Sequence, residues 1–400
     1  MKIDLKQQRL IPIYMLSCLI LRVAVSFNVF GFLQIVSYLV LGLTILNFLV
    51  MGCIFLRKPR MSRYDALVFI FVTLLVTFTI LNATDTKEAI YTAIEIALLI
   101  LVFNYYCHMI DTLLRTIALT FSCCVYANLA MMLMFPDWMF AAEDEFNSFL
   151  LGGNYNQMGC RFVLAIASSL LCANYSKKWL YNSIAVIIVS ISTLGIVGSM
   201  TSLSSIAVLC LILLIPSRQV RRFAVFGFFS FFVLFQVFVC FSGEGLYNND
   251  LAVYLVEDVL EKDLSFTGRT YLWDLAGGLF LQSPLIGYGY VGKEWFLANM
   301  TSFAIGPHNF IYALLIYGGI VLLGLYLTIF TIGVRHIVAS WESPAIVLMT
   351  CITTLHFMMT MEVYPMFFIL LLLTLSYYYP QLKASWNCLQ FPQEPSVNEI

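Results

Sequence analysis

Charged side chains are scarce in this sequence. Only 11% of its 400 residues are Asp, Glu, Lys or Arg, against about a quarter in a typical soluble domain, while 61% are hydrophobic. A chain of this composition cannot cover a globular surface with polar groups, which excludes a water-soluble protein. The formal net charge of −1 also lacks the excess of one sign that would indicate nucleic acid or an acidic macromolecule as a partner.

A cysteine framework is absent as well. The 11 cysteines are scattered, mostly inside apolar runs, and none of them form a Cys-x-x-Cys pair. We expect them to pack between helices rather than to form disulfides or bind a metal. Internal repeats and runs of alternating polar and apolar residues are missing too, which argues against a repeat protein and a β-barrel.

Long hydrophobic runs are abundant instead. They extend over roughly 18 to 25 residues, enough to cross a hydrocarbon core of about 30 Å as a helix. The sequence therefore predicts an all-α polytopic membrane bundle, a single integral membrane domain over residues 1–400, with about 12 transmembrane helices. The expected spans are 10–30, 33–56, 64–82, 88–105, 116–135, 159–175, 179–198, 201–216, 223–241, 309–334, 344–361 and 364–379.

Basic residues gather in alternate connections between these spans. The positive-inside rule places those connections, and with them both termini, on the cytoplasmic side. On the opposite side the segments 136–158 and 242–308 are too long to be simple turns, so a functional site is expected there. Residues 383–400 are expected to form a disordered cytoplasmic tail.

The outer segment 242–308 holds motif-like blocks. Arg269 and Trp273 are four residues apart in a stretch that predicts a helix at the membrane surface, so they share a face. An arginine there suits a phosphate through its planar fork, or alternatively meets lipid headgroups and nearby acids. Tyr288 lies in the block Pro284-Leu-Ile-Gly-Tyr-Gly-Tyr290, whose glycines predict a turn more readily than a phosphate cradle.

His308 precedes the span that is expected to begin near Asn309. Histidine can accept a proton from a sugar hydroxyl near neutral pH, which makes His308 a candidate general base; the alternative is a helix-start residue paired with a backbone carbonyl. In the segment 136–158, Asn156 and Arg161 lead into the next span, where Arg161 either faces the same site or is an interfacial, snorkelling arginine. The acidic run 143–145 lacks a spaced metal-binding pattern and is expected to be solvated.

Arg22 and Glu95 fall inside predicted spans. An unpaired charge there costs roughly 2.5 to 3.5 kcal/mol or more. The predicted boundaries place both residues about 10 Å below the outer surface. We therefore expect them to form an ion pair with a structural role.

These features, in this order, resemble the O-antigen polymerase and O-antigen ligase superfamily of bacterial membrane glycosyltransferases. The matching elements are the span count, the large, partly helical outer loop before about the tenth span, and the blocks Thr267-Gly-Arg-Thr270 with Trp273, Pro284 to Tyr290, Pro307-His-Asn309 and Gly153-Asn-Tyr-Asn-Gln157. One element departs from the family. Relatives often carry a Ser-Arg-Gly element where this chain has Ser199-Met-Thr-Ser-Leu-Ser-Ser205, so either Arg161 supplies that charge or the site uses one arginine with hydroxyl groups.

The resemblance implies an enzyme of the bacterial inner membrane that polymerises lipid-linked repeat units into O-antigen, capsular polysaccharide or exopolysaccharide. It implies an undecaprenyl-diphosphate-linked oligosaccharide as donor, with no metal, cofactor or nucleotide sugar. Arg269 would stabilise the departing diphosphate and His308 would receive the acceptor's proton. Substrate-binding roles fall to Arg161, Asn156, Trp273, Tyr288 and Asn309.

Membrane lipids, a chain-length regulator and a flippase are the further partners that the resemblance implies. Two alternatives remain open at this point. One is ligase-type transfer of the glycan to another acceptor, which differs from polymerisation only in the acceptor. The other is a transporter such as a flippase of the lipid-linked oligosaccharide, although transporters usually show repeats rather than one large outer loop.

Overall fold

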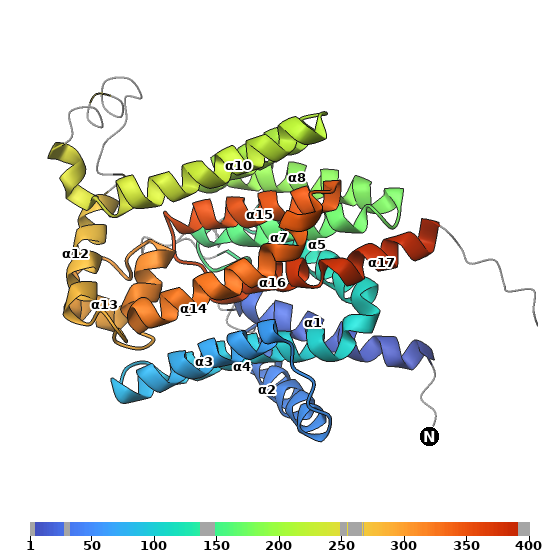
Figure 1. Ribbon diagram of the computed structural model, residues 1–400, viewed down its shortest axis with the longest axis horizontal. Helices are drawn as coiled ribbons and strands as arrows, with labels where there is room; N and C mark the ends of the chain where they lie inside the picture. Colours follow the sequence, from blue (N-terminus) through green and yellow to red (C-terminus); the bar gives the residue numbers. More distant parts are fainter. Residues whose placement is uncertain are drawn as a thin grey trace, which may run out of the picture.

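The computed structural model describes residues 5–27, 33–136, 149–248, 254, 266 and 268–390. Over these residues the secondary structure is helical, apart from two isolated bridges, Val25 to Leu151 and Phe149 to Gly153. Most helices run roughly parallel to the long axis of the molecule, whereas α2 crosses them steeply and α12 lies across one end (Figure 1). The all-α prediction is confirmed.

The main helices are, in chain order, α1 (Leu5–Ala24), α2 (Leu33–Arg57), α3 (Arg63–Leu81), α4 (Thr86–Tyr106), α5 (Ile110–Met134), α7 (Met158–Cys172), α8 (Lys177–Val197), α9 (Met200–Leu214), α10 (Arg218–Phe235), α12 (Arg269–Gln282), α13 (Lys293–Asn299), α14 (Phe310–Ser340), α15 (Ser343–Met359), α16 (Met366–Tyr377) and α17 (Tyr379–Gln390). The helix expected near Arg269 is thus present as α12. The tail expected to be disordered begins inside α17, so that prediction is wrong for its described part.

Six segments of the described chain are long and apolar enough to cross a membrane: Leu33–Arg57, Arg63–Leu81, Thr86–Met134, Lys177–Val197, Arg218–Cys240 and Phe310–Ser340. Thr86–Met134 comprises α4 and α5 with a short turn between them. Met200–Leu214, Ser343–Met359 and Met366–Tyr377 are shorter apolar helices. These segments indicate a multi-pass membrane protein, while the count of about 12 spans stays a prediction.

The surface and the interior both suit hydrocarbon surroundings. Large apolar side chains such as Leu56 and Leu214 are 79% and 76% exposed. Inside the bundle, Thr350, Thr353 and Thr354 each donate a hydrogen bond to the carbonyl four residues earlier in α15. Such internal bonds satisfy hydroxyl groups without water, as the interior of a membrane requires.

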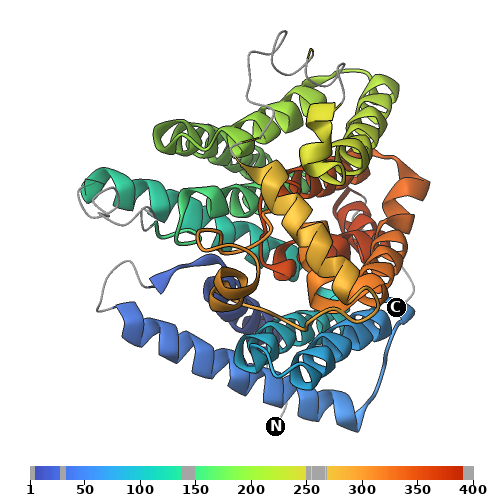
Figure 2. The ribbon, with the colours of Figure 1, turned by 90° about the vertical axis from the view of Figure 1, so that its left-hand side faces the viewer.

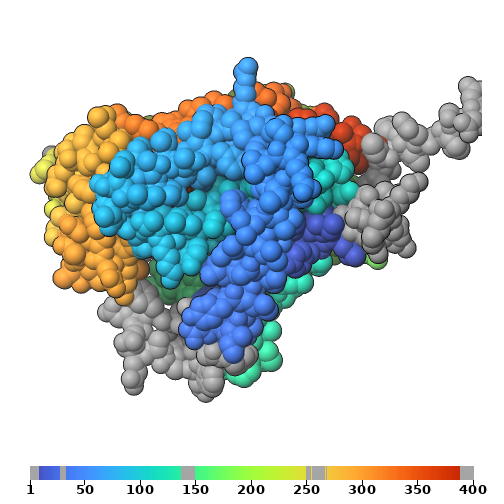
Figure 3. All heavy atoms as spheres, turned by 90° about the horizontal axis from the view of Figure 1, so that it is seen from below, coloured from blue at the N-terminus to red at the C-terminus, as the bar shows by residue number. Residues whose placement is uncertain are grey.

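The helices α7, α15 and α16 are the most buried part of the bundle. Gly159 of α7 shows how closely they pack, because a Cβ atom there would lie 2.0 Å from Met358 Cε and 2.4 Å from Ser202 Oγ. All three helices have one end near α12 and α13, at what we call the site end of the bundle. Figure 2 views this end, with α12 lying across it. Figure 3 shows the neighbouring face, which α2, α3 and α4 form and which the α12–α13 region borders.

α14 is interrupted where Gly318 and Gly319 depart from helical geometry, Gly319 with φ +59° and ψ −156°. The segment 284–289 inserts at this break and supplies the missing backbone partners. The bonds are Tyr288 N to Ile316 O at 2.7 Å, Gly289 N to Tyr317 O at 3.0 Å and Ile320 N to Pro284 O at 2.9 Å. A break in a membrane helix is stable when other groups of the protein make hydrogen bonds to the backbone N–H and C=O groups that the break leaves without helical partners. The segment expected to span the membrane over 309–334 is thus present as α14 but broken at Gly318 and Gly319, and the glycine-rich block is an insert rather than a turn alone.

We predict that Gly319→Ala and Gly287→Ala lower the stability of the protein. Both residues have φ +59°, and a Cβ would lie 2.3 Å from Leu285 C or from Ile316 O, respectively. The left-handed conformation alone costs about 1–2 kcal/mol for an L-residue. Thermal unfolding in detergent should show a lower apparent melting temperature. Gly324→Ala is the control, because that position of α14 has open space around it; unchanged unfolding of both variants would contradict the insertion.

Candidate active site

His308 occupies the turn that precedes α14. Its φ of +46° is uncommon for a residue other than glycine. Asn309 fixes this turn, because its Oδ1 accepts a bond from Tyr312 N at 3.1 Å, while its Nδ2 donates to Gln236 Oε1 at 3.0 Å and to Thr360 O at 3.1 Å. Asn309 is fully buried. Its geometry supports a role in positioning His308, whose strained backbone is typical of functional positions.

Glu362 holds the imidazole of His308. Nδ1 of His308 lies 3.3 Å from both carboxylate oxygens, and the side chains are 25% and 12% exposed. Oε1 also accepts a bond from Val363 N at 3.1 Å, which fixes the carboxylate. A proton on Nδ1 that is donated to Glu362 leaves the Nε2 lone pair free to act as a base.

Glu362 is a residue of the site that the sequence patterns did not predict. It lies in the short connection between the spans predicted over 344–361 and 364–379, outside the two long outer segments in which the site was expected. A single acid in so short an outer connection was the available signal, since a charge that close to two spans needs a partner or a function.

Arg269 is the first residue of α12, after Gly268 in the left-handed conformation. Its Nε donates to Met361 O at 3.0 Å and its Nη1 to Phe266 O at 3.2 Å. These bonds engage two of the five donors that a guanidinium carries. Met361 is adjacent to Glu362, so the predicted catalytic residues Arg269 and His308 are held by consecutive residues.

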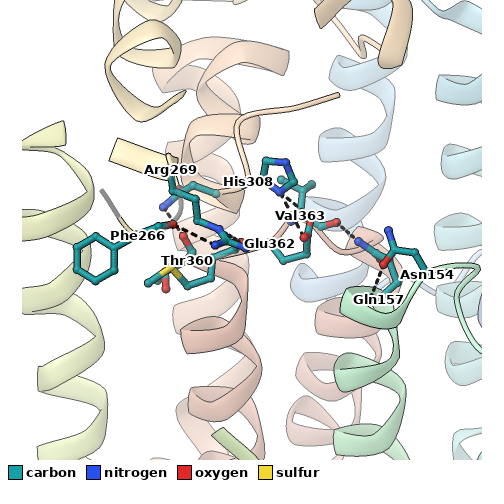
Figure 4. Close-up of polar contacts among 10 residues, drawn as sticks. Asn154, Gln157, Phe266, Arg269, His308, Thr360, Glu362 and Val363 are labelled. Atoms are coloured by element: carbon teal, nitrogen blue, oxygen red, sulfur yellow. Dashed lines mark hydrogen bonds and ion pairs between the residues drawn. The ribbon is translucent and has the colours of Figure 1, made fainter. Parts of the chain in front are cut away.

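A third contact reaches the same place from the 3-10 turn Tyr155–Gln157, which precedes α7. Gln157 Nε2 donates to Val363 O at 3.0 Å, and its backbone N donates to Asn154 Oδ1 at 3.1 Å. We call residues 361–363, between α15 and α16, the anchor segment. Figure 4 shows Arg269, His308 and Gln157 approaching the anchor segment from different elements. The contacts of Arg269 and Gln157 join residues that are 92 and 206 positions apart in sequence.

A cavity of about 340 Å³ lies beside His308, and we call it the histidine cavity. Its volume falls within the range of roughly 300 to 1,000 Å³ that is usual for small-ligand sites. Its charged and amide-bearing lining residues are Asn154, Asn156, Gln157, Lys293, His308 and Glu362. The predicted substrate-binding residue Asn156 therefore faces the same space as His308.

A second cavity, also of about 340 Å³, is lined by Arg22, Glu88, Tyr91, Thr92 and Glu95, and we call it the acidic cavity. Arg22 Nε lies 3.3 Å from Glu95 Oε1, which confirms the predicted ion pair. The two cavities adjoin, since they share part of their lining: Gln157, Tyr290, Tyr317 and Val363.

Trp273 and Tyr288, both predicted to bind substrate, make packing contacts. Trp273 is fully buried, with its ring centroid 6.2 Å from that of Phe266. The hydroxyl of Tyr288 donates to Leu279 O at 2.9 Å, and its ring lies 5.0 Å from that of Trp295. These contacts support a role in holding the loop against α12 and α13.

Arg161 is 4% exposed. Its Nε donates to Ala24 O at 2.9 Å, its Nη2 to Val23 O at 3.2 Å and its Nη1 to Gln157 O, and the guanidinium lies over the ring of Phe368. These bonds join the first turn of α7 to the last turn of α1. The geometry supports a structural anchor rather than a phosphate ligand.

Among the described residues, no three or more His, Cys, Asp or Glu side chains are grouped so that they could hold a metal ion. The acidic run 143–145 and Thr267 of the motif around Arg269 lie outside the described residues.

Residues 182–327 match the family model described as O-antigen ligase. The matched stretch extends from α8 into α14 and contains Arg269, Trp273, Tyr288, His308 and Asn309. This match confirms the resemblance to the O-antigen polymerase and ligase superfamily, whose members are membrane glycosyltransferase-like enzymes. No curated protein and no solved structure matches the chain.

Two variants should separate anchoring from ligand binding. Arg161→Met removes the N–H groups that donate to buried carbonyls, and each carbonyl left without a hydrogen bond costs about 1–3 kcal/mol. We therefore expect a lower apparent melting temperature.

Asn156→Ala changes a partly exposed residue of the histidine cavity. This variant should unfold like the parent protein while weakening glycan transfer. If Arg161→Met unfolded normally but lost transfer, Arg161 would act on the substrate instead.

Proposed function

Because the chain carries an O-antigen ligase family region at residues 182–327, we propose that it transfers an oligosaccharide from a polyprenyl-diphosphate-linked donor to a second lipid-linked repeat unit and so extends a surface polysaccharide. The convergence of Arg269 and His308 on the anchor segment, with His308 facing a cavity, carries this proposal. A cation for the departing phosphate and a base for the attacking hydroxyl are the groups that such a transfer needs.

In the proposed reaction, the acceptor hydroxyl oxygen forms a bond to the anomeric carbon of the donor while the bond from that carbon to the phosphate oxygen breaks. The hydroxyl proton passes to Nε2 of His308, and the electron pair of the broken bond leaves with the diphosphate. Glu362 keeps the proton on Nδ1 and orients the ring. Arg269 stabilises the charge that develops on the diphosphate, because fixed cations favour the transition state over the ground state.

Two further positive groups near His308 would favour a negatively charged diphosphate there. Lys293 is part of the lining of the histidine cavity. The N-terminus of α14 immediately follows His308 and Asn309, and the partial positive charge of a helix N-terminus favours anions nearby.

Ligase-type transfer is the second candidate, and the description of the matched family favours it. The chemistry would be the same, with a different molecule supplying the acceptor hydroxyl. A flippase, in contrast, would move the lipid-linked glycan without making or breaking a bond and would not require a histidine held in one tautomer by a carboxylate.

The first test uses a strain that lacks the gene, complemented with variants. His308→Ala and Arg269→Ala should each reduce transfer by about 10² to 10⁴-fold, which abolishes long chains on gels of surface polysaccharide while the protein still inserts. The matched controls are His108→Ala and Arg60→Ala, because both residues are exposed, His108 in the connection between α4 and α5 and Arg60 in the connection between α2 and α3.

The pattern on the gel identifies the reaction. Single repeats on the normal acceptor indicate lost polymerase, long chains left on lipid indicate lost ligase, and absence of both from the outer face indicates lost transport. Full-length polysaccharide from both site variants would refute the assigned roles.

A second test addresses Glu362 as a positioning residue. Glu362→Gln keeps the shape of the side chain but removes the negative charge that stabilises the protonated imidazole, so kcat should fall about 10- to 100-fold with little change in KM. The assay measures transfer by the purified protein with lipid-linked repeats extracted from the deletion strain. A raised KM at unchanged kcat would show that Glu362 contributes to binding and not to the orientation of His308.

A further inference from the structure

α4 presents a polar face toward the acidic cavity. Glu88, Tyr91, Thr92 and Glu95 have the spacing i, i+3, i+4 and i+7 and line the same space. They extend over about 10 Å of helix. A membrane helix that only packed against its neighbours would place apolar side chains on this face, so a polar stripe that lines a cavity indicates a ligand pathway or site.

The charged side chains that line the acidic cavity indicate which ligands it can bind. Arg22 is paired with Glu95, and Glu88 adds a further carboxylate at the exposed end of the stripe. The lining is therefore net negative, which disfavours phosphates and sugar acids. Carboxylates are acceptors only, so they match hydroxyl and ammonium donors.

Aromatic side chains complete the lining. Tyr91, Tyr290 and Tyr317 belong to it together with Phe310 and Phe367. Burial, with smaller contributions from nearby carboxylates, raises the pKa of Tyr290 to about 12, so its hydroxyl stays protonated and can both donate and accept. Flat apolar faces beside convergent acceptors fit a ring that carries many hydroxyl groups and has apolar C–H faces.

We propose that the acidic cavity is the binding subsite for the acceptor's sugar, and that it takes neutral or amino-bearing sugars in preference to acidic ones. The assignment to the acceptor rests on the proposed transfer reaction, whereas the binding of sugar does not. The diphosphate would leave on the side of Arg269 and Lys293. An attacking hydroxyl approaches from the side opposite the leaving group, and the acidic cavity adjoins the histidine cavity through Gln157 and Val363.

The test measures binding to the full chain in detergent by thermal shift, with glucose, N-acetylglucosamine, glucosamine, glucuronic acid and inorganic pyrophosphate as the probes. At least one neutral or amino sugar should give a saturable shift, and glucuronic acid a weaker one than glucose. Glu95→Gln and Glu88→Gln should each raise the apparent Kd for the sugar about tenfold, the effect of losing about 1.4 kcal/mol. Neither should weaken pyrophosphate binding, because each removes a negative charge.

Glu88→Gln and the control Glu294→Gln separate loss of sugar binding from loss of folding. Glu95→Gln leaves Arg22 without its partner and can fail to fold, whereas Glu88 is exposed, so Glu88→Gln keeps the proposal falsifiable. Glu294→Gln removes an exposed acid of the site end that is not among the lining residues of either cavity, and it should leave every Kd unchanged.

The proposal is overturned if no sugar gives a saturable shift, if Glu88→Gln leaves every sugar's Kd unchanged, or if the variants weaken pyrophosphate binding. Failure of the proposed function looks different. His308→Ala and Arg269→Ala would then retain full-length polysaccharide while sugar binding still depended on Glu88.

Discussion

The site depends on one short stretch of backbone, the anchor segment at residues 361–363. Its carbonyls and its one carboxylate hold Arg269, His308 and Gln157, which lie 92, 54 and 206 positions before their respective partners in the sequence. Because α15 and α16 are among the most buried helices, the segment between them is fixed at both ends. Arg269, His308 and Gln157 thereby acquire defined positions relative to one another, which is what a preorganised site requires.

A second constraint fixes the loop that reaches this segment. The insert 284–289 completes the hydrogen bonding at the break in α14, and the chain that follows it carries Tyr290, whose backbone N donates to Thr79 Oγ1 at 2.8 Å. Tyr290, which lines both cavities, is thus held by α3, and the insert just before it is held by α14. Backbone N–H and C=O groups that lose their helical partners inside a membrane cannot bond to water. The break in α14 is therefore stable only with the insert in place, and the insert needs the break for its own hydrogen bonds.

The sequence predicted one helix of this arrangement and one contact between distant spans. A charge inside an apolar run needs a partner, which led to the pair of Arg22 and Glu95, and helical spacing led to α12. The partners of uncharged loop residues and of Glu362 were outside the reach of such arguments. Nothing in the block around Tyr288 indicates that its glycines serve a break in a helix some thirty residues later, and Glu362 acquires meaning only beside His308. Asn309 of the block Pro307-His-Asn309 is buried and caps α14, whereas the sequence suggested a residue that contacts the substrate.

The distribution of charge across the two cavities follows from the same physics. In surroundings of low dielectric constant, charges act over longer distances than in water, so the binding of a diphosphate and of a hydroxyl-rich ring that we propose would gain from a separation of Arg269 and Lys293 from Glu88. Lys293 and Arg269 lie on the side of the anchor segment toward α12 and α13, whereas Glu88 lies on α4. In the proposed reaction His308, which Glu362 holds at the histidine cavity, accepts the proton of a hydroxyl that enters from the adjoining acidic cavity.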